Sequence, residues 1–249
     1  MEWIKPQFSR SQINKAGRFL VAPPDDTVEW FVHYVEAERI VNNWRASHSY
    51  PLNTFKVTLR RKTHDVDSNG LVAQRIKRMS SIELKLERFK TMQMTQMQDL
   101  GGCRAIVSTT AQVRSLLRRY EQSDLKHKLD DIDDYIANPK ASGYRGVHII
   151  YKYHSNTKAA EPYNGLFIEM QLRSRLQHAW ATAVETVGTF LKQSLKSSMG
   201  EDKWLRFFSL MGSAIARHEG ASALVPNTPT TKTALTKELR KIAGDLNVR

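Results

Sequence analysis

The 249-residue sequence lacks several features that define whole classes of protein. It contains one cysteine, Cys103, so an internal disulfide framework is excluded. No apolar run approaches the roughly 20 residues that a membrane-spanning helix requires. The first residues do not show the basic segment followed by an apolar segment that marks a signal peptide. We therefore expect a cytoplasmic protein that does not bind membranes.

Two common nucleotide-binding motifs are also missing. The sequence contains neither Gly-x-x-x-x-Gly-Lys-Ser/Thr nor Gly-x-Gly-x-x-Gly, which disfavours a P-loop ATPase and a Rossmann enzyme. The single His-Asp pair, His64-Asp65, lies in a polar segment with no second histidine at metal-ligand spacing. A metal-dependent hydrolase is therefore disfavoured. Cys103, beside a predicted strand, is more typical of a small core residue than of a nucleophile.

Positive charge, in contrast, is abundant. The sequence has 38 Lys and Arg against 25 Asp and Glu, a net charge of +13, which indicates a polyanionic partner. Residues 56–90 carry 10 basic and 4 acidic residues, a net charge of +6, and residues 175–249 carry +5. An excess of this kind is typical either of a solvated helix face or of a segment that binds phosphate.

The hydrophobic pattern predicts an α+β protein. Three segments have the β-branched and aromatic content or the alternation of strands, over 103–108, 146–153 and 166–172. Helical spacing of apolar residues predicts helices over 28–48, 53–61, 80–89, 113–120, 175–191, 201–218 and 233–246. Strands in the middle with helices at both ends indicate one domain with a sheet flanked by helices.

Local signals mark where some of these helices begin. Asp25 or Asp26 is expected to cap the first helix, and Ser80 or Ser81 is expected to cap the helix over 80–89. The segment 221–231, which contains two prolines, is expected to be a linker before the last helix.

A basic cluster precedes and enters the helix over 80–89. Five cations fall within 14 residues, namely Arg75, Lys77, Arg78, Lys85 and Arg88. A helix N-terminus near Ser81 with cations around it can bind an anion. Amphipathic basic helices are common, so the spacing alone also fits a solvated face.

A carboxylate follows at the entry to the first predicted strand. Asp99 precedes the pair Gly101-Gly102, which allows the backbone to approach a ligand closely, and Arg104 lies just beyond. An Asp at this place is a candidate metal ligand. The alternative is a turn residue that accepts hydrogen bonds from its own backbone.

A turn-rich loop leads into the second strand. It carries Lys140, Tyr144 and His148, with Tyr144 close to glycines at both sides. Such a tyrosine is expected to be exposed and can stack on a base. The alternative is a tyrosine that folds back onto the core.

The third predicted strand presents polar residues on one face. Glu169, Gln171 and Arg173 alternate along it and therefore point to the same side. Burying three unpaired polar groups would be costly, so either the strand is a solvated edge or the face is a catalytic floor. We favour the catalytic floor.

Taken in this order, the four segments resemble the RelA/SpoT-type pyrophosphokinase (alarmone synthetase) domain, over about residues 50–190. The resemblance implies a nucleotidyltransferase-like fold, with a mixed β-sheet surrounded by helices. It also implies transfer of the β,γ-pyrophosphate of ATP to a ribose 3′-hydroxyl, with AMP as the leaving group. On this basis we expect an N-terminal helical region over 1–50, a catalytic core over 51–195 and C-terminal helices over 196–249.

The resemblance also implies roles for individual residues. Asp99 and Glu169 would be the catalytic carboxylates and the Mg²⁺ ligands. ATP would be bound by Arg75, Lys77, Arg78, Ser81, Lys85, Arg88 and Arg104. The acceptor would be bound by Lys140, Tyr144, His148, Gln171 and Arg173.

The acceptor is a nucleotide whose identity the motifs leave open. The segment 42–52 and the helix around Trp180 are similar to the toxic small alarmone synthetases of toxin–antitoxin and antiphage systems, several of which modify the tRNA 3′ end. We therefore favour tRNA as the acceptor. The partner would be an antitoxin, either separate or fused after the toxin domain. The alternatives are a (p)ppGpp synthetase that uses GDP or GTP, and a noncatalytic RNA-binding module.

Overall fold

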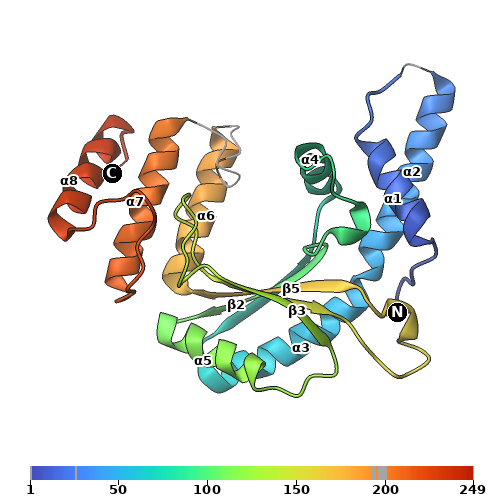
Figure 1. Ribbon diagram of the computed structural model, residues 1–249, viewed down its shortest axis with the longest axis horizontal. Helices are drawn as coiled ribbons and strands as arrows, with labels where there is room; N and C mark the ends of the chain where they lie inside the picture. The colour runs from blue at the N-terminus through green and yellow to red at the C-terminus, as the bar shows by residue number, and fades with distance from the viewer. Residues whose placement is uncertain (1, 26, 192–194, 196–200, 249) are drawn as a thin grey trace.

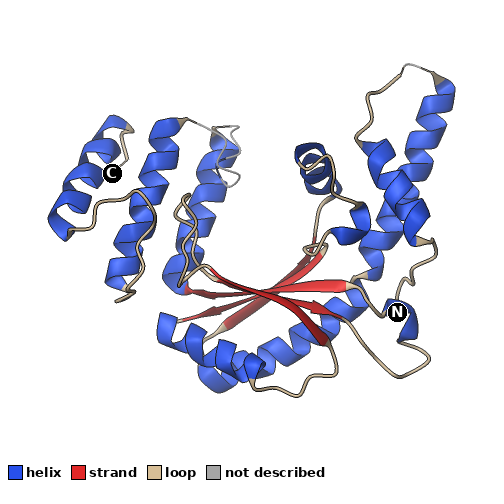
Figure 2. Ribbon diagram, in the orientation of Figure 1, coloured by secondary structure: helices blue, strands red, loops and turns tan. Residues whose placement is uncertain are grey.

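A five-stranded mixed β-sheet lies at the centre of the molecule, which confirms the expected α+β class (Figures 1 and 2). The computed structural model describes residues 2–25, 27–191, 195 and 201–248. The strands are β1 (Leu71–Ile76), β2 (Gly101–Val107), β3 (Lys128–Asp134), β4 (Val147–Lys152) and β5 (Phe167–Ser174).

The strand order places β5 at the middle of the sheet. The order is β1-β2-β5-β4-β3, in which β2 and β5 are parallel and the other neighbours are antiparallel. In the registers, Glu169 lies opposite Gly102, and Gln171 lies opposite Arg104 on one side and His148 on the other. The alternative of a solvated edge for this strand is therefore wrong, because both of its edges are paired.

Helices cover the two faces of the sheet unequally (Figure 1). The helices α3 and α5 lie against one face, whereas two groups of helices, α1, α2 and α4 on one side and α6 to α8 on the other, rise from the opposite face. None of the described helices is long and apolar enough to cross a membrane. The helices are α1 (Arg10–Leu20), α2 (Val28–Ser47), α3 (Ser49–Val66), α4 (Met79–Arg88), α5 (Thr110–Glu121), α6 (Arg175–Phe190), α7 (Asp202–His218) and α8 (Lys232–Asp245).

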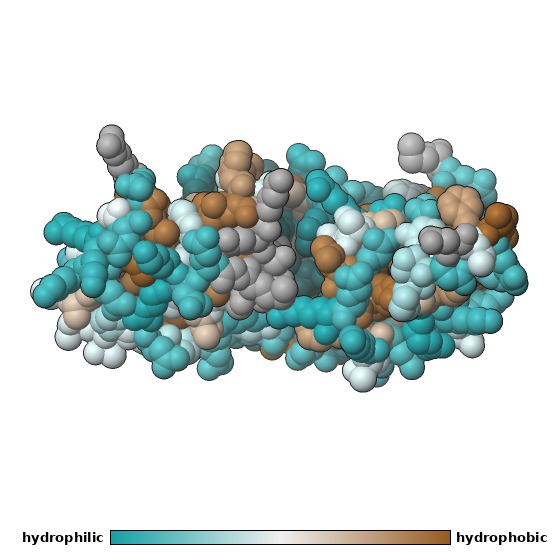
Figure 3. Space-filling model, turned by 90° about the horizontal axis from the view of Figure 1, so that it is seen from above, coloured by the Kyte–Doolittle hydropathy of each residue, from teal (hydrophilic) through white to brown (hydrophobic). Residues whose placement is uncertain are grey.

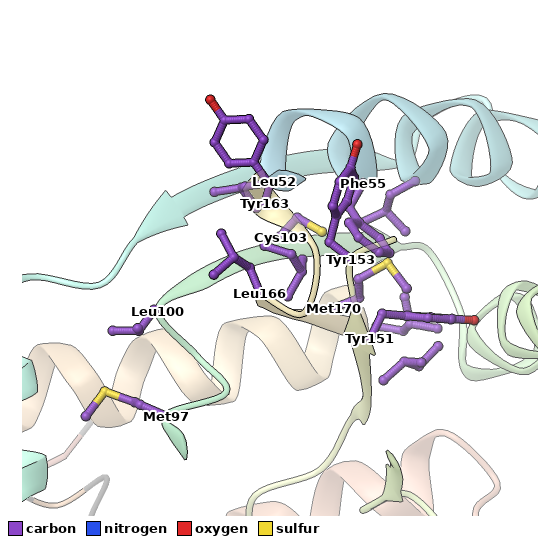
Figure 4. Packing of buried hydrophobic residues seen from close by; sticks show 14 of the residues in the cluster. Leu52, Phe55, Met97, Leu100, Cys103, Tyr151, Tyr153, Tyr163, Leu166 and Met170 are labelled. Atoms are coloured by element: carbon purple, nitrogen blue, oxygen red, sulfur yellow. The ribbon is translucent and has the colours of Figure 1, made fainter. Parts of the chain in front are cut away.

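The main core fills the space between the sheet and α3 (Figure 4). Leu52 and Phe55 of α3 face the side of the sheet that carries Cys103 and Met170, and all four are at most 2% exposed. Cys103 is therefore a core residue, as expected, and burial raises the pKa of its thiol. Alternation along β2 and β5 sends the apolar residues into this core and leaves the polar ones on the opposite face.

A second buried cluster joins α6 and α7, with α8 packed against it. Its members include Trp180, Val184, Phe207 and Phe208. The main core, in turn, contains residues of α1 and α2 together with the sheet. The two cores thus divide the chain at α6, and the N-terminal helices share a core with the sheet.

The helix starts differ from the sequence expectations in two places. Thr27, rather than Asp25 or Asp26, caps α2, because its side chain accepts from the Trp30 amide while Asp25 accepts from the Thr27 amide. The helix α4 begins at Met79 after Arg78, so the serines at 80 and 81 lie inside its first turn and do not cap it.

Three elements were not expected from the sequence, and one helix is longer. The strands β1 and β3 are edge strands rich in charged or exposed residues, so they lack the apolar pattern of a buried strand. The helix α1 is short and mostly polar, and its few apolar residues pack into the core. The helix α3 extends to Val66, beyond the expected end at 61, and therefore includes His64-Asp65.

The loop before β4 approaches α7 very closely. Gly143 has φ +98°, a conformation that favours glycine, and a Cβ on Gly212 of α7 would lie 2.5 Å from the Gly143 oxygen. The indole of Trp180 donates to the Phe208 carbonyl at 2.9 Å beside this contact. Glycine at position 212 therefore allows α7 to pack against the backbone of the loop at Gly143.

Gly212→Ala should destabilise the protein by about 1–3 kcal/mol, because the added methyl group has to displace backbone atoms. Gly244→Ala is the matched control, since no atom lies within 4 Å of a Cβ at that position of α8. It should be neutral or stabilising. Thermal unfolding of both variants measures the difference, and equal midpoints would show that the close approach carries no constraint.

Candidate functional site

The face of the sheet opposite α3 and α5 carries the polar residues of β2, β4 and β5. Glu169, Gln171 and Arg173 are 9%, 9% and 2% exposed, so they are buried although two of them are charged. Buried polar groups of this kind need hydrogen-bond partners, and each of the three has one. The structure thus places the predicted floor residues together on the central strand.

A pair of lysines binds Asp99 at the entry to β2. Lys77 Nζ, just after β1, lies 2.7 Å from Asp99 Oδ2, and Lys85 Nζ, on α4, lies 2.8 Å from Oδ1. The Lys77 amide also donates to the Leu100 carbonyl at 2.8 Å, which fixes the segment after β1 beside the loop that holds Asp99. Three residues that the sequence separates by 22 positions or fewer therefore form one charge cluster.

The ion pairs decide the ionisation of Asp99. Burial by itself raises the pKa of this carboxyl, but the charges and hydrogen bonds of Lys77 and Lys85 outweigh burial and lower the pKa to about 2. The carboxylate is therefore charged at neutral pH, and the cluster carries one net positive charge.

Gln171 connects the arginines to Glu169. Its Oε1 accepts from Arg104 Nε at 3.2 Å and from Arg173 Nη2 at 2.8 Å, and its Nε2 donates to Glu169 Oε2 at 2.8 Å. This orientation of the amide follows from the partners, because guanidinium groups only donate and an ionised carboxylate only accepts.

A second chain of hydrogen bonds reaches Glu169 from the loop before β4. Arg173 donates to the Tyr144 hydroxyl at 2.9 Å, the hydroxyl lies 2.5 Å from His148 Nε2, and His148 Nδ1 lies 2.9 Å from Glu169 Oε1. Since Arg173 only donates, the Tyr144 hydroxyl gives its proton to Nε2. His148 in its neutral form then carries its proton on Nδ1 and donates it to Glu169.

All of these bonds end at the Glu169 carboxylate. Burial alone raises its pKa and so does the charge of Asp99, but the hydrogen bonds from His148 and Gln171 lower it overall. Glu169 is therefore held ionised in a buried position.

Two hollows lie on this face, on either side of Gln171. A cavity of about 120 Å³ is lined by Tyr144, His148 and Arg173 on one side and by Trp180, Val184 and Phe208 on the other. A smaller one of about 60 Å³ lies over Arg75, Gly102, Arg104 and Glu169. Viewed from above, the molecule is hollowed between its two helical flanks (Figure 3).

Tyr144 is half-buried, which corrects the expectation of an exposed loop residue. Its ring packs edge-on against Tyr135, His148 and Trp180, with centroid distances of 5.7, 5.5 and 6.2 Å. Burial raises the pKa of its hydroxyl, partly offset by Arg173. The ring still lines the larger cavity, so the tyrosine has folded back without leaving the site.

The remaining candidates lie around the rim. Lys140 is exposed and its ammonium lies 4.0 Å from the centre of the Tyr135 ring. Arg75 is exposed on β1 opposite Gly102. Three residues of α4 and its start are not joined to the networks above: Arg78 and Arg88, which are exposed, and Ser81, which lies in the first turn.

The apolar wall of the larger cavity is the part that sequence reasoning missed. Trp180, Val184, Leu205 and Phe208 come from α6 and α7, and their helical spacing is that of any core helix. These side chains line the cavity because α7 packs closely against the loop at Gly143, a tertiary contact that the sequence does not reveal.

Comparison with known proteins identifies the region that holds these networks. Residues 74–189 match the family described as a region found in RelA / SpoT proteins. The GTP pyrophosphokinase YjbM of Bacillus subtilis is 28% identical over 113 residues, which are 45% of this chain and 52% of that protein. The match thus spans about half the length of this curated relative.

Solved structures share the fold. Small alarmone synthetase 1 from Bacillus subtilis superposes with a TM-score of 0.57 at 20% identity, covering 80% of this chain and 94% of that one. Small alarmone synthetase 2 from the same organism gives 0.60 at 18% identity, covering 72% and 94%. Residues 74–189, a little under half of the chain, are thus similar to the RelA/SpoT family, in agreement with the resemblance of the motifs.

The Asp99 ion pairs predict a pH dependence of stability. A pKa lowered from 3.8 to about 2 means that the folded protein binds the proton less tightly than the unfolded chain. The contribution, about 2 kcal/mol, is complete above the unfolded value and is lost as the pH falls through the folded value. Between pH 6 and pH 2 the wild type should lose about 2 kcal/mol more than Asp99→Asn in urea unfolding. An equal loss in both proteins would contradict the ion-pair assignment.

Proposed function

We propose that this chain is an ATP-dependent pyrophosphokinase that transfers the β,γ-pyrophosphate of ATP to a ribose 3′-hydroxyl and releases AMP. The observation that carries the proposal is the arrangement around Glu169. A buried, ionised carboxylate lies between a hollow lined by arginines and a cavity lined by aromatic rings. A transfer between two nucleotides needs a binding site for the donor, a binding site for the acceptor and a general base between the two sites.

The smaller hollow and the lysine cluster suit ATP. Transfer of phosphoryl groups depends on positioning and charge neutralisation more than on covalent chemistry. Lys77 and Lys85 are the cations that would bind the triphosphate, and in the free protein they neutralise Asp99 instead. Arg104, above the floor of the sheet, and Arg75 are placed to stack on adenine.

The carboxylates fit Mg²⁺. This ion is usually held by one or two carboxylates together with substrate phosphates, and Asp99 and Glu169 supply two ionised carboxylates beside the predicted phosphate site. Among the described residues no group of three or more potential ligands occurs, so the phosphates would have to complete the coordination. When bound, the ion would neutralise charge on the transferred group.

Glu169 is the group that we propose accepts the 3′-hydroxyl proton. Its two oxygens are oriented by His148 and Gln171, and its lowered pKa keeps it ionised at neutral pH. A fixed, charged carboxylate in a low-dielectric place needs little reorganisation when the proton arrives. Tyr144, His148 and Arg173 line the cavity from which an acceptor would present its ribose.

For the acceptor we propose the 3′ end of tRNA, which would make the protein a toxin that inhibits translation. The wall of the larger cavity belongs to α6 and α7, and exposed cations continue beyond it on α7 and α8. These are Lys203, Lys232, Lys237, Arg240 and Lys241. A polyanion that extends past the cavity would meet this charge, whereas a mononucleotide would not.

A guanine nucleotide is the second candidate acceptor. The curated relative is named a GTP pyrophosphokinase. A structure of small alarmone synthetase 1 from Bacillus subtilis, with a TM-score of 0.57 at 21% identity, contains its product pppGpp. In this chain the cavity beside Tyr144 would then bind GDP or GTP, and the stringent response would be its setting.

Incubation with γ-labelled ATP and either tRNA or GDP separates the two acceptors. We expect label in tRNA and none with Asp99→Asn or Glu169→Gln, because these variants remove the two carboxylates. Label in guanosine nucleotides alone would exclude tRNA. Absence of transfer to both acceptors would contradict the enzymatic proposal. The remaining hypothesis would be a noncatalytic RNA-binding protein, and it predicts that the two carboxylate variants have the cellular phenotype of the wild type.

Tyr144→Phe tests the hydroxyl separately from the ring. It should lower kcat by about tenfold or more at nearly unchanged acceptor KM, because Glu169 loses the orientation that His148 transmits. Tyr144→Ala should in addition weaken the acceptor by about 1–3 kcal/mol, and ATP binding should survive both changes. Arg104→Ala should instead weaken ATP.

Tyr120→Phe is the matched control for this series. The Tyr120 hydroxyl is buried under the opposite face of the sheet without a hydrogen-bond partner, so its loss breaks no bond. Steady-state kinetics of the four variants decide the matter. Wild-type kcat in Tyr144→Phe would show that the hydroxyl plays no part in the reaction.

A further inference from the structure

The outer face of α2 is an exposed apolar stripe that the function above does not use. Val28, Phe31, Val32 and Val35 are 81%, 61%, 59% and 47% exposed. Their spacing of three, four and seven residues places them on one side of the helix. The opposite side packs onto α1 and the core through residues such as Ala37 and Val41. The helix is therefore apolar on two faces, only one of which is covered.

The stripe is bordered by negative charge in a strongly positive protein. The segment 25–38 contains five acidic residues and no Lys or Arg, while the whole chain carries +13. At 100° per residue, Glu29 and Glu36 fall on one border of the stripe and Glu38 on the other. All three are exposed. Glu36 pairs with Arg39 at 2.7 Å and Glu29 lies 3.8 Å from His33, so Glu38 is the border carboxylate that neither contact includes.

A surface with an apolar centre and acidic borders is complementary to one kind of partner. A basic amphipathic helix lays its apolar side into the centre and places its cations over the borders. An anionic membrane or a nucleic acid would be repelled by the borders. In Figure 3, hydrophobic surface (brown) is visible at the right, on the flank formed by α1 and α2. The predicted acceptor cavity lies on the other flank, beside α6 and α7.

The same helix contacts the segments that bind Asp99. Tyr34, on its inner side, lies close enough to Glu83 of α4, the helix that carries Lys85, for the Glu83 charge to raise the pKa of its hydroxyl, which burial raises most. Near its end, Arg45 donates to the Lys77 carbonyl at 3.3 Å. A shift of α2 would therefore be transmitted to both lysines of the cluster, without passing through the acceptor cavity.

We propose that the outer face of α2 docks a basic amphipathic helix of a partner protein, and that docking changes ATP affinity through Tyr34 and Arg45. The docking itself stands on the stripe and its borders, whereas the effect on ATP rests on the proposed function. By thermodynamic reciprocity, ATP would change the affinity for the partner by the same factor.

The docking test uses the full chain and a synthetic helical peptide of leucine and lysine in amphipathic spacing. Fluorescence anisotropy should show binding that weakens with salt. It should also weaken by about tenfold or more in Phe31→Ser/Val35→Ser. Val57→Ser, which changes an equally exposed residue on α3, should bind like the wild type. Thermal unfolding confirms that each variant is folded.

Three outcomes would overturn the docking proposal. One is equal binding by the double serine variant. Another is equal binding of a peptide in which glutamate replaces every lysine. The third is self-association of the wild type that the serine variant abolishes in sedimentation, because a second copy of the chain would then be the occupant.

Coupling is measured by titrating ATP with and without the lysine peptide. The peptide should change the ATP Kd several-fold in the wild type and by a smaller factor in Tyr34→Phe, which binds the peptide normally and keeps the Arg45 contact but lacks the hydroxyl near Glu83. An ATP Kd that ignores the peptide in the wild type would overturn the coupling. If the wild type binds no ATP at all, the proposed function fails while the docking result stands.

Discussion

The site depends on keeping the Glu169 carboxylate ionised inside the protein. Burying such a charge is costly, and only paired hydrogen bonds and nearby cations make it tolerable. The structure meets this cost with two chains of donors that both start at Arg173. One passes through Gln171 and the other through Tyr144 and His148, and both end on the two oxygens of Glu169. Every donor in both chains points toward the carboxylate. Loss of any member therefore leaves its neighbour without a hydrogen-bond partner.

This requirement explains why the polar residues lie on the central strand. At an edge, water would screen the charges and loosen the geometry. In the middle, β2 and β4 supply Arg104 and His148 in register from either side. The opposite face of the same strands fills the main core with residues such as Met170, so packing holds the floor rigid. A single alternation along β5 therefore serves both stability and the predicted chemistry.

Part of this arrangement could be predicted from the sequence, and part of it could not. Alternation of Glu169 and Gln171 predicted a shared face, and the structure confirms it, because a strand period is a local property. The pairing of Asp99 with two lysines could not be derived from periodicity, since it needs α4 to fold over the sheet entry. The edge strands β1 and β3 escaped prediction because their charged sequences follow no burial pattern. The aromatic wall at Trp180 escaped because a core helix and a binding wall share the same spacing.

The lysine cluster suggests how the free protein avoids an unbalanced site. Lys77 is 8% exposed, and a buried charge without a partner is costly. Asp99 supplies the negative charge, and in the proposed function a triphosphate would take its place. Arrival of ATP would then exchange one anion for another and release Asp99 toward a divalent ion, so both events depend on a single rearrangement. Since α2 contacts both lysine-bearing segments from behind, a partner bound to α2 could favour either arrangement without reaching the site.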